Sequence, residues 1–218
     1  MPMSQSTFTI LLGGELHMTE RLRAAVSGSR FIAADGGMRH ALALDVRPEL
    51  WVGDFDSTPD DLTAAFSDTP RKPYPAAKAA TDGEIAVSEA IARGAKRLIL
   101  VGALSGDRSD HALQHLLYAV SLAETGLDVL LTSGTEEAVP LIAGSITLDL
   151  PKNSLFSVPA FSELSGLFIE NARYPLSDFH LPFGSSRTIS NVAEGPVRFS
   201  LESGRAIVLA RPYDLSGV

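Results

Sequence analysis

The pattern of apolar and polar positions divides the chain into two parts. In the first part, short apolar runs that end near glycine alternate with amphipathic stretches. Such runs are typical of strands buried on both faces of a parallel sheet, and the amphipathic stretches are typical of helices. The predicted strands are 8–12, 30–34, 50–52, 98–101 and 127–131. This alternation predicts an α/β domain with a doubly wound, mainly parallel sheet.

Two helices can be placed from their end signals and their periodicity. Thr81 and Glu84 have the spacing of a capping box, in which Thr81 caps the first turn and Glu84 reaches back to it. A second helix begins near Ser109. Its predicted apolar face consists of Leu113, Leu116, Leu117 and Val120.

The pattern changes after about residue 135, where no further helix is predicted. Short apolar segments separated by turn residues recur at 145–150, 154–158, 167–169, 197–201 and 206–209. Segments of this kind predict a small antiparallel β sandwich. We therefore expect two domains, an α/β nucleotide-binding catalytic domain at 1–135 and a β-sandwich domain at 136–218.

Composition narrows the class of function. The formal net charge of the 218 residues is -8, which argues against broad binding to nucleic acid or anionic membranes because both need a positive field. The chain has no cysteine, so disulfides and thiolate metal sites are excluded. It shows neither a signal peptide nor an apolar stretch of about 20 residues that could span a bilayer. We expect a soluble, cytoplasmic protein.

Acidic side chains follow the predicted strands or begin the predicted helices. They are Asp35, Asp54, Asp56, Asp82, Asp107 and Asp110. Ligands of open α/β sheets bind at the carboxyl ends of the strands, and side chains two residues apart in an extended segment, such as Asp54 and Asp56, point to one side. Magnesium prefers oxygen ligands and bridges to phosphates. The set therefore predicts carboxylate-held magnesium acting on a nucleotide triphosphate, although each aspartate alone could be a turn former or helix cap.

Basic and glycine residues near these carboxylates are candidates for phosphate contacts. Lys78 precedes the capped helix and Arg108 begins the next one, so both could neutralise phosphate oxygens. Gly13–Gly14 and Gly36–Gly37 would let backbone amides approach a phosphate. Neither a Walker loop nor the dinucleotide glycine fingerprint is present.

His111 and His115 lie four residues apart on a predicted helix. Zinc ligands can have this spacing, but no partner motif accompanies the pair. Because His111 follows Asp110, it is the better candidate for a residue of the nucleotide site. Trp51, the only tryptophan of the chain, continues a strand and is predicted to lie in the core.

Taken in order, these residues resemble the thiamine pyrophosphokinase family. The stretches that carry the resemblance are 34–37, 52–57, Lys78 with Thr81, Asp82 and Glu84, 102–104 leading to Arg108 and Asp110–His111, 174–176, and 189–191. The family pairs an N-terminal α/β domain with a C-terminal β sandwich. It forms homodimers whose active sites lie between subunits. The resemblance implies that the hydroxyl of thiamine attacks the β-phosphorus of ATP, which gives thiamine diphosphate and AMP.

The resemblance also implies roles for individual residues. Asp54, Asp56 and Asp82 would hold Mg²⁺ and, with Asp110, would form the catalytic group. ATP or its metal would be positioned by Asp35, Gly36, Lys78, Thr81, Arg108, Asp110 and His111. Ser190 and Asn191 would help to form the thiamine pocket, in a domain that also mediates dimerisation.

Several positions depart from the family pattern. Ala79 and Val192 stand where acidic residues are usual. The stretch 105–108 is one residue longer than the glycine-glycine-arginine turn of the family, which affects the placement of Arg108. Some members stack a tryptophan on thiamine, and that tryptophan has no counterpart here. Phe199 or Tyr213 is the aromatic residue we consider as its substitute.

Three alternative functions remain open at this point. Residues 54–58 also fit the nucleophile motif of phosphatases of the haloacid dehalogenase type, in which Asp54 would become phosphorylated. A pyrophosphokinase of the same fold could use a pterin-like alcohol as its acceptor. A non-catalytic nucleotide-binding module is the third alternative, and the retained aspartates argue against it.

Overall fold

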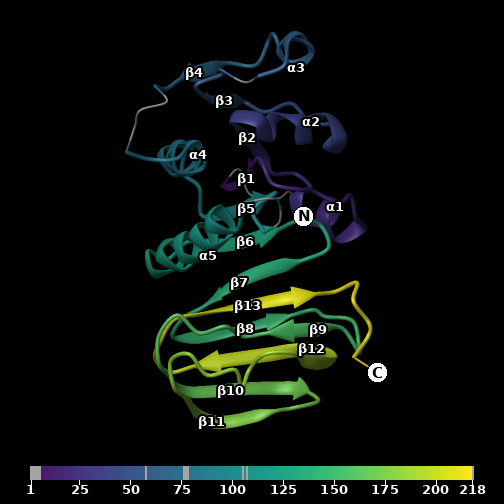
Figure 1. Ribbon diagram of the computed structural model, residues 1–218, viewed down its shortest axis with the longest axis vertical. Coiled ribbons are helices and arrows are strands. Elements are labelled where there is room, and N and C mark those ends of the chain that lie inside the picture. The colour runs from purple at the N-terminus through teal and green to yellow at the C-terminus, as the bar shows by residue number, and fades with distance from the viewer. Residues whose placement is uncertain (1–5, 57, 76–78, 105, 107, 218) are drawn as a thin grey trace. The chain divides into compact units, whose positions relative to one another are not determined.

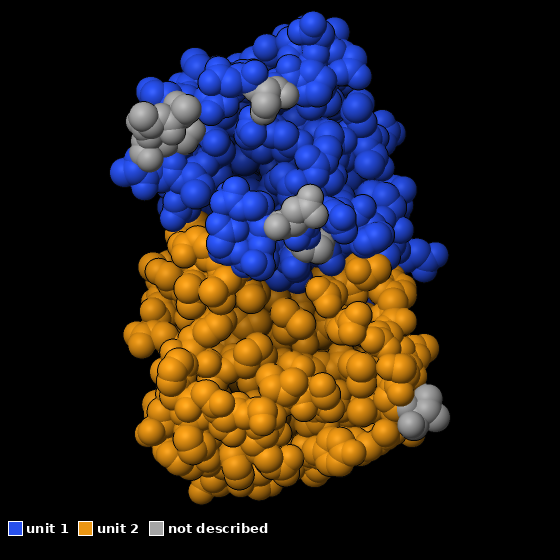
Figure 2. All heavy atoms as spheres, viewed as in Figure 1, with its two compact units in different colours: residues 1–112, 127–134 blue, residues 113–126, 135–218 orange. Residues whose placement is uncertain are grey.

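The chain folds into two compact units, which Figures 1 and 2 show in ribbon and space-filling form. The computed structural model describes residues 6–56, 58–75, 79–104, 106 and 108–217. Unit 1 comprises residues 1–112 and 127–134, and unit 2 comprises residues 113–126 and 135–218. The predicted domains, 1–135 and 136–218, differ from this division mainly in the segment 113–126.

Unit 1 is built on a parallel sheet. Its described strands are β1 (Thr7–Leu11), β2 (Arg30–Ala34), β3 (Leu50–Gly53), β4 (Arg71–Pro73), β5 (Arg97–Val101) and β6 (Asp128–Thr132). Their order across the sheet is β6-β5-β1-β2-β3-β4, and each neighbouring pair is parallel. The predicted parallel sheet is therefore confirmed. β4 was not predicted because its residues are exposed and include no apolar run.

Helices connect these strands. They are α1 (Glu20–Val26), α2 (Arg39–Leu44), α3 (Asp60–Ala65) and α4 (Asp82–Ala92), and a 3-10 helix, η1 (Asp35–Met38), precedes α2. Figure 1 shows α1 and α2 on one side of the strands and α4 on the other, which is the arrangement of a doubly wound sheet. The capping box of α4 is present as predicted: the Glu84 N–H donates to Thr81 Oγ1 at 3.2 Å, and the Thr81 N–H donates to Glu84 Oε2 at 2.8 Å.

Helix α5 (Ser109–Glu124) buries a different set of residues from the one predicted. Leu113 and Leu117 are 52% and 42% exposed. The buried residues of α5 are Ala119, Val120 and Leu122, so burial is confined to the second half of the helix. The spacing of the leucines located a helical face but could not show where along the helix that face is covered. None of the described helices is long and apolar enough to cross a membrane.

Trp51 occupies the core of unit 1, as predicted. Its side chain is fully buried, its Nε1–H donates to the carbonyl oxygen of Asp35 at 2.9 Å, and the ring of Phe55 packs edge-on against it with centroids 5.2 Å apart. A buried indole needs such a hydrogen-bond acceptor. The interaction therefore ties the end of β2 to β3.

Unit 2 is built from antiparallel strands. They are β7 (Glu137–Leu141), β8 (Gly144–Leu148), β9 (Leu155–Ser157), β10 (Leu164–Ala172), β11 (Leu176–Leu181), β12 (Asn191–Leu201) and β13 (Ala206–Arg211). The long strand β12 pairs with β8 and β10, and near its start with β9. β9 pairs in turn with β13, and β13 pairs with β7. β12 thus joins two groups of antiparallel strands, and no helix occurs in the described residues after 135.

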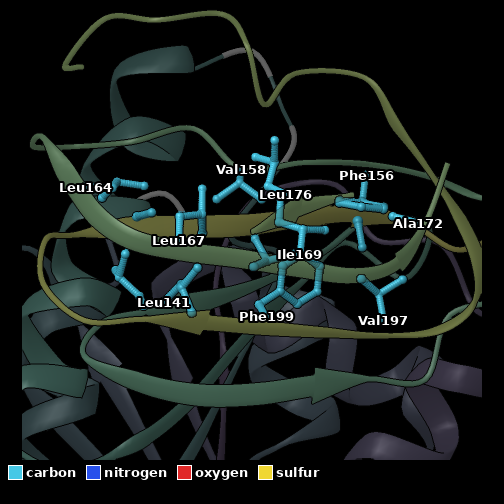
Figure 3. Close-up of a cluster of buried hydrophobic side chains, with 14 of the residues drawn as sticks. Leu141, Phe156, Val158, Leu164, Leu167, Ile169, Ala172, Leu176, Val197 and Phe199 are labelled. Carbon is cyan, nitrogen blue, oxygen red and sulfur yellow. The ribbon is translucent and has the colours of Figure 1, made fainter. Parts of the chain in front are cut away.

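The core of unit 2 lies between these strands (Figure 3). Leucine, isoleucine and valine side chains from β7 and β10–β13 fill it, together with Phe156 and Phe199. The rings of Phe156 and Phe199 meet edge to face with centroids 5.3 Å apart. Their burial makes an antiparallel structure of short strands stable, because the apolar face of each strand is covered by another strand.

Phe199→Ala should lower the free energy of unfolding of unit 2 by about 3–5 kcal/mol, because the change leaves a cavity beside Phe156. Urea denaturation followed by circular dichroism measures the effect. The matched control is Phe183→Ala: Phe183 is 70% exposed, so its removal should change the free energy by less than about 0.5 kcal/mol. Equal effects of the two changes would contradict the assigned core.

Candidate functional site

The parallel sheet of unit 1 brings several strand ends to one edge. The chain leaves β1 at Gly13–Gly14, β2 at Asp35 and β3 at Asp54. From β1 the strands proceed outward to β4, and the chain then returns to place β5 on the other side of β1. Open α/β sheets bind their ligands where the strand order reverses in this way. The candidate site therefore lies at the carboxyl edge of β1, β2, β3 and β5.

Asp35 stands at this edge with a buried carboxylate oxygen. Its backbone has φ 44°, in the left-handed region, and its Oδ1 is buried without a hydrogen-bond partner among the described residues. A Cβ atom on Gly53 would lie 3.2 Å from the Asp35 Cα, so β3 ends in glycine where the two strand ends meet. A buried carboxylate oxygen without a donor is unfavourable by itself. A bound cation or a donor group of a ligand would satisfy it.

Asp54 and Asp56 lie in a turn and not in the extended segment assumed from their spacing. Phe55 between them has φ 62°, and the Asp56 N–H donates to Asp54 Oδ1 at 3.2 Å. The segment turns here because the ring of Phe55 packs on Trp51. Asp54 is half-buried and Asp56 is exposed, so the argument from alternation does not apply to this pair.

The same turn contains a polar group, Thr58, that the sequence analysis noted only as part of the phosphatase-type motif at residues 54–58. The Thr58 N–H donates to the Phe55 carbonyl oxygen at 3.3 Å, and Thr58 Oγ1 is buried with no hydrogen-bond partner in the described part of the chain. Apart from that motif, its only sequence signal is its place two residues after Asp56. The neighbouring Ser57 lies outside the described residues.

The start of α4 contributes Thr81 and Asp82. Thr81 Oγ1 accepts the Glu84 N–H and lies 3.1 Å from Glu84 Oε2, so a contact of this hydroxyl with ATP would have to share it with the helix cap. Asp82 is half-buried in the first turn of α4, where a negative charge is favourable. Lys78, predicted to contact ATP, lies outside the described residues.

Arg108 and Asp110 form a two-point ion pair at the start of α5. Arg108 Nε lies 2.9 Å from Asp110 Oδ1, and Nη2 lies 2.7 Å from Oδ2. The Arg108 guanidinium holds the pKa of the Asp110 carboxyl well below its usual range. Both side chains are exposed, as is His111. Arg108 is thus engaged by a carboxylate, and Asp110 by a cation, before any ligand binds.

The carboxylates match magnesium in donor chemistry. Among the described residues, however, no group of three or more His, Asp or Glu side chains lies close enough to hold a metal ion. Magnesium at phosphate sites usually takes one or two carboxylates and completes its shell with water and phosphate oxygens. The unpartnered Asp35 Oδ1 fits such a shared site. The ligand set Asp54, Asp56 and Asp82 stays a prediction.

Ser190 and Asn191, predicted to bind substrate, lie in unit 2 and have different surroundings. Ser190 is exposed, has φ 59°, and its N–H donates to Ser157 Oγ at 3.0 Å. Asn191 is buried. Its Oδ1 accepts the N–H groups of Tyr174 and Val192 at 3.1 and 2.8 Å, and its Nδ2 donates to the Tyr174 carbonyl at 2.8 Å. The Asn191 side chain therefore holds the Tyr174 main chain in place.

The two aromatic residues considered as substitutes for a stacking tryptophan differ in exposure. Phe199 is fully buried in the core of unit 2, so it cannot stack on a substrate and that expectation is wrong. Tyr213 is 48% exposed. Tyr174 is 52% exposed and hydrogen-bonded to Asn191 next to Ser190, although the sequence analysis noted only its motif.

Comparison with known proteins adds independent information. A family model described as thiamin pyrophosphokinase, catalytic domain, matches residues 24–131. A comparison with curated proteins finds no match. The matched range contains every residue to which the resemblance assigns a catalytic, metal-binding or ATP-binding role, whereas Gly13–Gly14, Ser190 and Asn191 lie outside it.

Several solved structures are similar to the chain. The crystal structure of thiamine pyrophosphokinase from Bacillus subtilis has a TM-score of 0.83 at 21% identity and covers 94% of this chain and 98% of its own. The match to the enzyme from Geobacillus thermodenitrificans has a TM-score of 0.79 at 25% identity, and it covers 95% of this chain and 98% of that enzyme's chain. The match to the enzyme from Candida albicans has a TM-score of 0.75 at 12% identity, and it covers 94% of this chain and 90% of that enzyme's chain.

At these identities, the Bacillus subtilis and Candida albicans structures show that the fold is shared across nearly the whole of both chains. The family model adds a match in sequence, and its range spans the strand ends at which the acidic residues of unit 1 gather. Fold and sequence thus agree on one assignment. The chain belongs to the thiamin pyrophosphokinase family.

Proposed function

We propose that the protein is a thiamine pyrophosphokinase that transfers the pyrophosphoryl group of ATP to the hydroxyl of thiamine. The observation that carries the proposal is the family match over residues 24–131, because this range includes the acidic carboxyl edge of the parallel sheet. The net charge of -8 suits the cationic substrate thiamine better than a nucleic acid.

The reaction displaces AMP from ATP. The hydroxyl oxygen of thiamine attacks the β-phosphorus, the bond from that phosphorus to the oxygen bridging to the α-phosphate breaks, and the hydroxyl proton leaves to a base. Phosphoryl-type transfer depends mainly on alignment of the reactants and neutralisation of charge. A site made of carboxylates, backbone turns and basic side chains meets these needs without a protein nucleophile.

Asp54, Asp56 and Asp82 would hold Mg²⁺, which when bound neutralises charge on the phosphate oxygens. The half-buried position of Asp54 supports the assignment, as does the turn that sets Asp56 beside it. Asp35, whose Oδ1 is unpartnered, would contribute to the metal or to its water shell. All four side chains offer only oxygen ligands, which magnesium prefers.

The ATP contacts come from the same edge. Gly36, Lys78, Thr81, Arg108 and His111 would contact the nucleotide, and Asp110 would act through its ion pair with Arg108. This pair fixes the direction of the guanidinium in advance. Phosphate would then bind to the remaining N–H groups of Arg108, because a guanidinium has five donors.

Thiamine would contact Ser190, and Asn191 would act by shaping the pocket. The surroundings of the two residues support these different roles. The amide of Asn191 is buried and hydrogen-bonded to the Tyr174 main chain, whereas Ser190 is exposed. We further propose a homodimer in the cytoplasm whose active sites form between subunits, with unit 2 as the dimerisation and thiamine-binding domain.

The alternatives drawn from the sequence are not favoured. The similar structures named above are thiamine pyrophosphokinases, and the family match is to their catalytic domain. In the phosphatase alternative Asp54 would be a nucleophile, and that alternative gives no role to the antiparallel strands of unit 2. A pterin-like acceptor would leave the site in unit 1 unchanged, so only a test of substrates separates it from thiamine.

Purified protein should release AMP only when ATP, Mg²⁺ and thiamine are all present, and thiamine diphosphate should appear in equal amount. Mass spectrometry of the products measures both. Chelation of the metal should stop the reaction, and added Mg²⁺ should restore it. Release of phosphate without thiamine, with a phosphorylated Asp54, would instead support the phosphatase, and turnover of a pterin alcohol alone would exclude thiamine as the acceptor.

Asp56→Asn should lower the rate of AMP release by about a hundredfold or more. A neutral amide cannot replace the negative carboxylate that would hold Mg²⁺, and Mg²⁺ neutralises charge on the transferred group. The control is Asp60→Asn, which removes the same charge from the exposed first turn of α3 and should leave the rate nearly unchanged. Circular dichroism should show both variants folded. Near-normal turnover of folded Asp56→Asn would refute the metal assignment.

A further inference from the structure

Arg39, the first residue of α2, makes hydrogen bonds within the described part of the chain only to main-chain carbonyl groups. Its Nη2 donates to the carbonyl oxygens of Gly13 and Gly14, the latter at 3.1 Å, and its Nη1 donates to Gly36 O at 3.5 Å. Gly13 and Gly14 follow β1, and Gly36 follows β2. A single side chain therefore links the ends of two neighbouring strands at the edge where the ligand is expected.

The positive charge of Arg39 has no carboxylate partner among the residues that the structure describes. Its neighbour His40 also contacts the turn, with Nε2 2.8 Å from Gly14 O. Burial, with a smaller contribution from Arg39, lowers the pKa of His40, so His40 is mainly neutral at pH 7. Of these two side chains, Arg39 supplies the charge. Arg108, by contrast, is already paired with Asp110.

The turn that Arg39 contacts is held at Gly14 by the segment that follows β5, but it has open space beside Gly13. The Gly14 N–H donates to the Gly102 carbonyl oxygen at 3.1 Å, and a Cβ atom on Gly102 would lie 2.7 Å from Leu12 O. A Cβ atom on Gly13, however, would meet nothing within 4 Å. There is thus room for a ligand beside an exposed guanidinium at the point where the strand order reverses.

We propose that Arg39 is a further nucleotide-binding residue, whose guanidinium donates to phosphate oxygens of ATP beside Gly13 and Gly14. The proposal rests on the proposed function, since it places the triphosphate at this edge. Guanidinium bonds to phosphate are charge-assisted and stronger than bonds to neutral carbonyls, so a phosphate would replace or share the present acceptors. Arg39 would approach from the β2 side of β1, and Arg108 from the β5 side.

The test compares Arg39→Gln and Arg39→Lys with wild type and with Arg47→Gln. Arg47 is a matched control because it is exposed and also donates to a main-chain carbonyl, that of Ala65 at 2.7 Å. Calorimetric titration of each protein with a magnesium complex of a non-hydrolysable ATP analogue, and separately with adenosine, gives the dissociation constants. Thermal unfolding of each variant is recorded in parallel.

Arg39→Gln should weaken binding of the ATP analogue by about tenfold or more and leave adenosine binding unchanged. Arg39→Lys should retain part of the lost affinity because it keeps the charge, and Arg47→Gln should match wild type. Unchanged affinity of Arg39→Gln for the analogue would overturn the proposal. Equal weakening of analogue and adenosine would also overturn it, because Arg39 would then act only on the shape of the turn.

The outcome is separable from a failure of the proposed function. If wild type binds the ATP analogue in an Arg39-dependent way but releases no AMP with thiamine, the assignment of Arg39 stands and the acceptor is wrong. If thiamine-dependent AMP release is normal and Arg39→Gln binds as tightly as wild type, the function stands and the role of Arg39 is refuted.

Discussion

Close approach of main chain at the ends of β1, β2 and β5 is the constraint on which the site depends. A Cβ atom on Gly37 would lie 2.1 Å from Leu11 O, and one on Gly102 would lie 2.7 Å from Leu12 O. Only glycine permits these distances, because the neighbouring atoms belong to the backbone and cannot move aside. This packing brings Arg39, which follows Gly37 in the chain, to the turn after β1, while Asp35 lies at the end of β2 beside β3.

Charge at this edge is arranged for a ligand that carries both signs. Within the residues that the structure describes, Asp35 has a buried oxygen without a donor, while Arg39 has a charge without a carboxylate. A complex of a divalent cation with a triphosphate would meet both requirements at once, since its metal attracts carboxylates and its phosphates attract guanidinium groups. These groups without partners are energetically unfavourable in the free protein, and such groups are typical of binding sites.

The sequence was sufficient to predict those elements whose structure is determined by residues close together in the chain. Buried strands that end in glycine and the capping box of Thr81 and Glu84 were predictable because their signals are short-range. Contacts between distant residues were not predictable. The turn at Phe55 depends on packing against Trp51, and the role of Asn191 depends on the Tyr174 main chain. β7 and β11 were missed because their apolar residues are interrupted by polar ones or by proline.

A crystal structure with magnesium, thiamine and a non-hydrolysable ATP analogue tests the central claim most directly. The account predicts that the phosphates lie at the carboxyl ends of β1, β2 and β3, with the metal bound to a carboxylate of Asp54 or Asp56 and a phosphate oxygen within hydrogen-bonding distance of Arg39. Binding of the triphosphate away from this edge, with these carboxylates and Arg39 in contact only with solvent or with their present partners, would contradict the account.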